Sequence, residues 1–209
     1  MKELTIRYLM AKRIIIERGF QNEVQWQSSL CIEELNETVF LKELAWVILS
    51  SGMREKVIRE LFPDISNCFF NWSSAKVIAD NADICFNSAI REFNHRPKIA
   101  AIIWAAKKIE NINFDDFKNQ IKENPIEVLQ QFPYIGSKTV FHLAKNIGLP
   151  VAKPDRHLLR IAYQEGFSNV QDFCSQISQM SGDSIPVVDI VLWRFATVEK
   201  DYLIKFKNL

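Results

Sequence analysis

Lys138 and Asp155, which lie 17 positions apart, are the two residues of this sequence best suited to covalent chemistry. A lysine amine is a nucleophile once it has lost its proton. An ionised carboxylate can stabilise positive charge and then transfer protons. Each residue also has a simpler interpretation, because a lysine at a helix start often contacts a phosphate and an aspartate there often caps the helix. From spacing alone, the phosphate contact is favoured for Lys138.

The segment around these two residues, 130–164, is basic. It holds one acid, Asp155, and a net charge of +4, whereas the whole chain carries only +1; its five cations are Lys138, Lys145, Lys153, Arg156 and Arg160. This asymmetry indicates a phosphate backbone as a partner. A basic surface without any partner remains the alternative on charge alone.

The segment also has the pattern of two helices joined by a tight apolar hairpin, over about 125–147. Asn124, Pro125 and Glu127 predict a capped helix over 125–131, with Glu127 closing a capping box. A second helix is expected over about 137–146, ending at Gly148. Gly136 is expected to adopt a positive φ and to let a phosphate approach the backbone, while the amides at the second helix start form an anion site. Such binding is independent of base sequence.

Four stretches resemble motifs of the helix-hairpin-helix (HhH-GPD) superfamily of DNA glycosylases. Residues 132–140, FPYIGSKTV, resemble its hairpin, which typically reads Leu/Phe-Pro-Gly-Ile/Val-Gly-x-Lys-Thr-Ala. Residues 154–160, PDRHLLR, resemble its Val-Asp-x-His-x-x-Arg. Residues 44–53 and 93–99 resemble more weakly its Leu-Leu-Ser-Ala-Gln helix end and its Tyr-Asn-x-Lys-Ala-x-x-Ile segment. The resemblance covers roughly 37–165 and is nearest to the compact archaeal-type 8-oxoguanine DNA glycosylase/AP lyases.

This resemblance implies a two-lobed, all-α fold and a role for each matching residue. Lys138 would be the nucleophile that attacks C1′ of a flipped nucleotide, and Asp155 the carboxylate that assists it. The residues that would bind DNA phosphates are Tyr134, Gly136, Ser137, Thr139, Arg156 and Arg160. The candidates for the base wedge or pocket are Met53, Arg54, Trp46 and Trp193, and each tryptophan is alternatively part of the core.

The sequence departs from the family pattern at two places. Tyr134 stands where the family's hairpin usually has glycine. The 8-oxoguanine relatives tend to end on a lysine that helps to read the lesion, whereas this chain ends with Phe206–Leu209 and runs a little further. The excised base therefore does not follow from the resemblance, although 8-oxoguanine is favoured. The partner implied is double-stranded DNA with a damaged or modified base, bound by a cytoplasmic, nucleoid-associated monomer.

Three functions remain open. The first is a glycosylase with AP-lyase activity, acting in base excision repair through Lys138 and Asp155. The second is a monofunctional glycosylase for another modified base, phage-type bases included, in which Asp155 activates water. The third, of another class, is a non-catalytic DNA-binding module built on the same hairpin.

The sequence pattern predicts helices for almost all of the chain that must position these residues. Glycine is scarce, at 6 in 209 residues, and apolar residues recur with a helical period, as in Leu4, Tyr8, Ala11 and Ile15. Helices are expected over 37–49 after Asn36, over 55–61 before Pro63, from Ser73 or Ser74, from Pro97, from 168–171 and over 185–199. The N-terminal helices and those of about 168–200 are expected to form one lobe of a single unit, and 54–165 the other.

Several classes of protein do not fit this composition. No apolar stretch reaches the ~20 residues of a membrane span, and the N-terminus does not read as a secretory signal. The four cysteines are scattered, which argues against an iron–sulfur cluster and favours buried thiols in a reducing compartment. The spacing of His95, His142 and His157 supports no metal site. No cofactor is expected, although the family also allows a monovalent cation at the hairpin.

Overall fold

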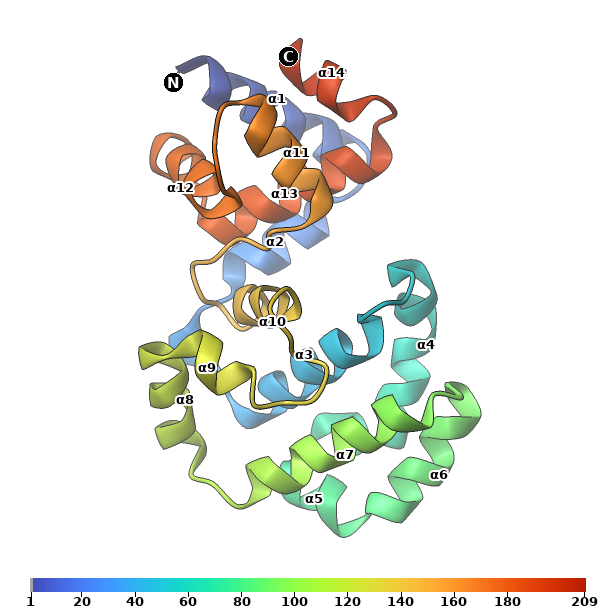
Figure 1. The fold of residues 1–209 in the computed structure, drawn as a ribbon. Helices are drawn as coiled ribbons and strands as arrows, with labels where there is room; N and C mark the ends of the chain where they lie inside the picture. Colours follow the sequence, from blue (N-terminus) through green and yellow to red (C-terminus); the bar gives the residue numbers. More distant parts are fainter. Residues whose placement is uncertain (1) are drawn as a thin grey trace. The chain divides into compact units, whose positions relative to one another are not determined.

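The computed structural model describes residues 2–209, and every regular element in that range is a helix, as the sequence predicts. The chain divides into two compact units. Unit 1 combines the N-terminal residues up to Cys31 with Gly148–Leu209, and unit 2 is Ile32–Ile147. Figure 1 follows this path in colour, with the blue and red ends of the chain in the same unit. None of the helices in the described range is long and apolar enough to cross a membrane.

The unit boundaries differ from the expected lobes of 54–165 and the rest. Helix α3 (Glu37–Ser50) belongs to unit 2, and the segment after Gly148 belongs to unit 1. The segment after Gly148 belongs to unit 1 because the apolar stripe of helix α11 (Arg156–Gln164) buries Leu158 and Ile161 in the core of that unit. Asp155 therefore lies in the unit that contains the chain ends, and Lys138 lies in the other.

Unit 1 is built around a core that joins both ends of the chain. The predicted stripe of the first helix is buried, and its Tyr8 hydroxyl donates a hydrogen bond of 2.6 Å to Asp183. Phe173, Phe195 and Phe206 fill the same core. The helices of this unit are α1 (Lys2–Glu17), α2 (Gln21–Ser29), α11, α12 (Val170–Ser181), α13 (Ile185–Val198) and α14 (Tyr202–Lys207).

Unit 2 has its own aromatic core. The Phe40 ring lies edge-on against Phe117 at 5.1 Å and against Phe132 at 5.5 Å, which joins α3 to the hairpin region. Its further helices are α4 (Glu55–Cys68), α5 (Ala75–Asp80), α6 (Ala82–Glu92), α7 (Arg96–Glu110), α8 (Phe114–Glu123), α9 (Pro125–Leu129) and α10 (Thr139–Asn146), with 3₁₀ turns at Ile32–Glu34 and Phe70–Trp72.

Helix starts follow the capping signals in most cases. The side chains of Asn36 and Ser74 accept hydrogen bonds from Val39 and Val77, as predicted, and Pro97 lies in the first turn of α7. At α9 the start is confirmed, but the Asn124 side chain makes no capping bond, so the predicted capping box is wrong. Helix α12, expected from 168–171, begins at Val170, and the side chain of Asn169 caps it.

Pro63 does not end the helix that was expected to stop before it. Helix α4 runs through this proline to Cys68. An interior proline removes one backbone hydrogen bond and costs about 3 kcal/mol. Packing offsets that cost, because the helix buries Ile58 and Ile65, and its Phe62 ring lies edge-on at 5.2 Å from Trp46.

Candidate functional site

A single hydroxyl closes the hairpin between α9 and α10. The amide of Gly136 donates to Oγ1 of Thr139 at 2.7 Å, and that hydroxyl donates to the carbonyl oxygen of Tyr134 at 2.8 Å. Helix α10 begins at Thr139, two residues later than expected. Thr139 is thus a structural residue of the turn, and the Gly136 amide already has an acceptor inside the chain.

The left-handed position of the hairpin is Tyr134 and not Gly136. Tyr134 has a φ of +65°, whereas Gly136 is absent from the glycines with positive φ, so the expectation for Gly136 is wrong. A side chain in the left-handed region costs roughly 1–2 kcal/mol, which explains why glycine is usual where this chain has tyrosine. No atom lies within 4 Å of the place a Cβ on Gly136 would take. The backbone there is open to an external group.

The Tyr134 ring is 38% exposed and meets two residues at the start of α7. The ammonium nitrogen of Lys98 lies 5.7 Å from the ring centroid, and the His95 ring lies edge-on at 6.5 Å. The tyrosine therefore lies against the start of α7 while one side of its ring stays in solvent.

Lys98 is a buried cation that the sequence analysis missed. It is 2% exposed, and its ammonium donates to the carbonyl oxygens of Leu49 at 2.6 Å and Ser51 at 2.5 Å. Burial lowers the pKa of Lys98. The sequence offered one indication of this burial, because Lys98 lies on the apolar stripe of α7, one turn before Ile102. Lys98 thus holds the end of α3 beside the hairpin.

Lys138 is exposed immediately before the first residue of α10. Its side chain makes no hydrogen bond or ion pair with any residue in the range 2–209. Nucleophilic attack needs a neutral, desolvated amine. Because unit 2 does not bury this side chain, the desolvation would have to come from a bound substrate.

Asp155 caps helix α11, as the simpler interpretation predicts. Its Oδ1 accepts from the amides of His157 at 2.8 Å and Leu158 at 2.9 Å. Its Oδ2 has no hydrogen bond to the described residues. One carboxylate oxygen is therefore structural, and the other is available to an external group.

His157 lies directly beside this cap. Its Nε2 accepts from Arg156 at 3.3 Å, and its ring lies edge-on to Tyr202 at 5.2 Å. Burial lowers the pKa of His157, against the opposing effect of the Asp155 charge. These contacts favour a structural role for this histidine. Arg156 and Arg160 are exposed on α11, where a phosphate could reach them.

The candidates for the base wedge and pocket are divided among separate environments. Met53 is 39% exposed and Arg54 is also exposed, in the turn between α3 and α4. Trp46 is half-buried between Phe62 and the Arg59 guanidinium, at 5.6 Å. Trp193 packs on the core of unit 1, with the Arg194 guanidinium 4.7 Å from its ring. Both tryptophans contact neighbours in their own units, which favours the core interpretation for each.

Thiol and metal chemistry find little support in the described residues. Cys85 and Cys174 are buried as expected, but Cys31 is exposed. Burial raises the pKa of Cys85 to about 11, which makes its thiol unreactive. Within residues 2–209, no group of three or more His, Cys, Asp or Glu side chains is arranged to hold a metal ion.

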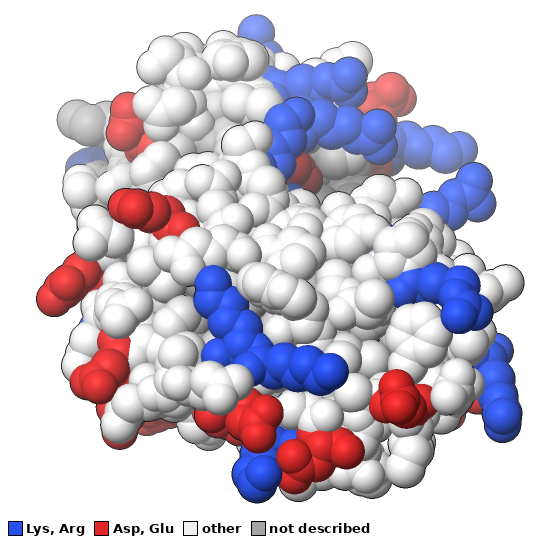
Figure 2. Space-filling view, turned by 60° about the horizontal axis from the view of Figure 1, so that its bottom comes forward, with Lys and Arg blue, Asp and Glu red and all other residues white. Residues whose placement is uncertain are grey.

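Charge is mixed on the face of the molecule drawn in Figure 2. One group of basic side chains lies in the middle of this face, a larger one lies along its upper right, and acidic side chains lie mainly along its lower and left edges. No broad basic surface covers this view.

Comparison of the chain with models of protein families, with curated proteins and with solved structures found no match.

Proposed function

We propose that this chain is a helix-hairpin-helix DNA glycosylase with AP-lyase activity, acting on a damaged or modified base, with 8-oxoguanine favoured. The observation that carries the proposal is the hairpin that Thr139 closes, with the Lys138 amine exposed at its end and unpaired among residues 2–209. Asp155, 17 residues later, supports it with one unused carboxylate oxygen.

The first step would be binding to phosphates. The amides of Ser137, Lys138 and Thr139 donate to no group in residues 2–209, and the first amide bond of the turn into α10 is from Val140 to Gly136, at 3.0 Å. Free amides at a helix start suit an anion. Such contacts position a protein on DNA without reading its sequence.

The second step would be excision of a flipped base. The neutral Lys138 amine forms a bond to C1′, the N-glycosidic bond breaks, and the base leaves with the electron pair and takes up a proton. The Asp155 carboxylate stabilises the positive charge that develops at the sugar. The amine nitrogen loses its proton and the sugar ring opens to a Schiff base, from which β-elimination breaks the bond to the 3′ phosphate. Flipping costs least for a damaged or mispaired base.

Borohydride trapping tests this proposal. Duplexes with 8-oxoguanine, uracil, oxidised, hydroxymethylated or glucosylated pyrimidines, 3-methyladenine or an abasic site would each be incubated with wild type, Lys138→Gln and Asp155→Asn. Lys56→Gln, an exposed lysine on α4, is the matched control. The expected result is a covalent band with one base that persists in Lys56→Gln and disappears in Lys138→Gln. A band that persists in Lys138→Gln would overturn the role of this lysine.

A monofunctional glycosylase is the second candidate, and the solvent exposure of Lys138 is the observation that favours it. In that case Asp155 activates water and Lys138 only contacts phosphate. Release of free base without a covalent band or strand scission would identify this activity. A non-catalytic DNA-binding module would release no base, and its affinity would hardly change in Asp155→Asn.

A further inference from the structure

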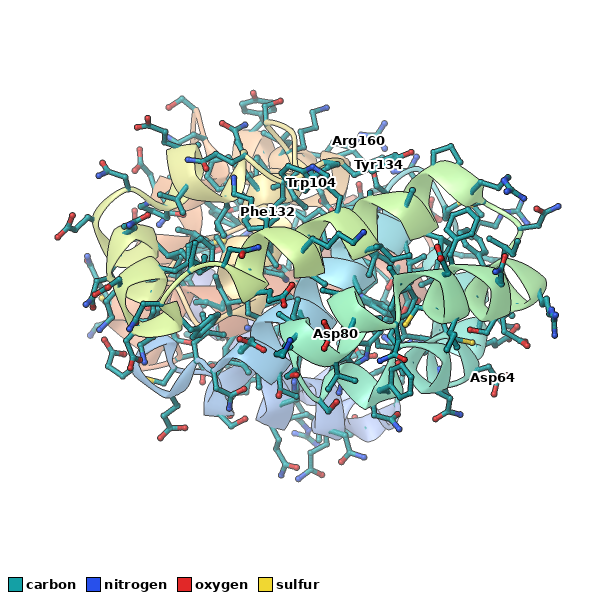
Figure 3. The ribbon with its side chains drawn as sticks, turned by 90° about the horizontal axis from the view of Figure 1, so that it is seen from below. Asp64, Asp80, Trp104, Phe132, Tyr134 and Arg160 are labelled. Carbon is teal, nitrogen blue, oxygen red and sulfur yellow. The ribbon has the colours of Figure 1, made fainter. Side chains whose placement is uncertain are left out.

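An exposed tryptophan, Trp104, lies beside the hairpin with a lysine next to its ring. Trp104 is 45% exposed, and its indole stands edge-on to the buried Phe132 ring at 6.3 Å. The ammonium nitrogen of Lys108 lies 5.4 Å from the centroids of both rings. In Figure 3 the labelled side chains of Trp104, on α7, and Phe132, in the turn before α10, lie close together. We call Trp104, Lys108 and Phe132 the indole platform.

The core of unit 2 does not need this indole. The buried stripe of α7 is made by other residues, among them Ile99, Ile102 and Ile103. Ala100, one turn before Trp104, is small and exposed, so it leaves the ring uncovered on that side. Phe132 is 2% exposed and holds the indole from below. The platform is thus rigid on its inner side and open on its outer side.

The charges around the platform fit a polyanion. Lys108 also donates to Oε1 of Gln131 at 2.9 Å, which fixes its ammonium beside the rings. Lys107 is exposed on the same turn, and its ammonium group has no partner among the described residues. The acid nearest in sequence, Glu110, is engaged with Lys76 at 3.6 Å. A flat aromatic face next to two cations has the chemistry to bind a base together with its phosphates.

We propose that Trp104 is a stacking site for an unpaired base of a DNA strand, and that Lys108 and Lys107 bind the adjoining phosphates. This inference rests on the proposed function in taking DNA as the partner. It adds that the protein holds a stretch of strand whose bases are already unpaired, at a place distinct from Lys138. Stacking uses the face that every base has, so the site tolerates any sequence.

Fluorescence anisotropy with undamaged single strands tests the site without requiring catalysis. The probes are a labelled oligothymidine and a strand of the same length made only of abasic sugars. The variants are Trp104→Ala and Trp26→Ala, since Trp26 on α2 is exposed to a similar degree, 40%. Stacking on one aromatic ring corresponds to a loss of about 5-fold to 100-fold in affinity on removal. Wild type and Trp26→Ala are expected to prefer the oligothymidine by such a factor, and Trp104→Ala to bind both strands equally.

Two further measurements support the assignment to this platform. Lys108→Gln should lower the slope of log affinity against log salt by about 0.7, the value for one phosphate on a single strand. Trp104→Phe, which retains a ring in the same place, should keep part of the preference for bases. Trp104→Phe should unfold close to the wild-type temperature, whereas Trp104→Ala loses the contact with Phe132 and should unfold at a lower one. A thermal melt checks that both variants are folded at the temperature of the binding measurement.

The proposal is overturned if wild type binds the abasic strand as tightly as the oligothymidine, or if Trp104→Ala retains the preference. It is also overturned if the wild type is a dimer that Trp104→Ala dissociates, since a second copy would then cover the indole. None of these results depends on base excision. If Lys138 is trapped on a substrate but wild type shows no preference for bases, the proposed glycosylase stands and the stacking site at Trp104 is refuted. If wild type prefers bases through Trp104 but Lys138 is never trapped, the stacking site stands and the role of Lys138 is refuted.

Discussion

The ammonium group of Lys98 lies 2.6 Å from the carbonyl oxygen of Leu49 and is closed off from solvent. This contact joins the first turn of α7 to the last turn of α3. The same ammonium also bonds to Ser51 and faces the ring of Tyr134. One buried charge therefore fixes both the turn that contains Met53 and the ring at the hairpin tip.

Replacing Lys98 should destabilise the protein more than any exposed lysine of the same helix. Lys98→Met keeps the apolar stem but removes the donor from the buried carbonyl of Leu49 and the part-buried carbonyl of Ser51, a loss of about 2–4 kcal/mol. Urea denaturation measures this loss. Lys107→Met, on the exposed side of α7, is the control and should change the free energy of unfolding by less than about 0.5 kcal/mol. Equal stability of the two variants would show that the Lys98 contacts add nothing.

Substitutions at Tyr134 should separate backbone strain from loss of the ring. Tyr134→Ala and Tyr134→Gly both remove the ring, but only glycine adopts a φ of +65° without steric cost. Tyr134→Gly should therefore be more stable than Tyr134→Ala by about 1 kcal/mol. Thermal or urea unfolding of the pair measures the difference.

Gly136→Ala provides the comparison for that pair. Its backbone is not left-handed and the space beside its α-carbon is empty, so alanine should change stability by less than about 0.5 kcal/mol. A large loss in Gly136→Ala, with no difference between the two Tyr134 variants, would mean that the left-handed position is Gly136 after all.

The sequence predicted local features of this fold better than the features that depend on distant residues. The caps at Asn36, Ser74 and Asp155 were predictable because each depends on amides two or three residues away. Pro63 was misread because the packing of Ile58 and Ile65, which keeps α4 continuous, comes from other helices.

The candidate site shows the same limit. The hairpin could be located from 132–140, but its conformation depends on a bond between Thr139 and two earlier residues that no spacing rule describes. Lys98 was missed because a lysine on an apolar stripe can either extend into solvent or be buried against a partner. Here it is buried because the carbonyl groups at the end of α3 accept its hydrogen bonds, and the sequence does not show that they lie nearby.

Glu43 should make stability fall as pH rises. Its carboxyl is buried between α3 and α10, with Asn146 donating to Oε2 at 2.9 Å, and burial raises its pKa from 4.5 to about 7, although Asn146 and the Lys42 charge act in the opposite direction. The folded state then binds more protons than the unfolded state between these two values. The contribution of Glu43 to the free energy of unfolding should be largest below a pH of about 4.5 and should decrease by up to about 3 kcal/mol as pH rises through 7.

Glu43→Gln should abolish this dependence. The amide cannot ionise and its oxygen can still accept from Asn146, so the variant should be more stable than wild type at about pH 8 and similar to it at about pH 5. Urea denaturation across this range measures both. Other groups, such as His157, titrate in both proteins and cancel in the difference. Glu60→Gln, an exposed control on α4, should follow the wild-type curve, and parallel curves for wild type and Glu43→Gln would refute the prediction.

Two substitutions of Asp155 should separate its cap from its chemistry. Asparagine caps helices about as well as aspartate, so Asp155→Asn should keep both amide bonds and unfold close to the wild-type temperature. Asp155→Ala loses the cap and should cost about 1 kcal/mol. Under the proposed function both variants lose base release, because neither retains a carboxylate beside the sugar. If Asp155→Asn released base at the wild-type rate, Asp155 would be a helix cap only, and the carboxylate that assists Lys138 would have to be sought elsewhere.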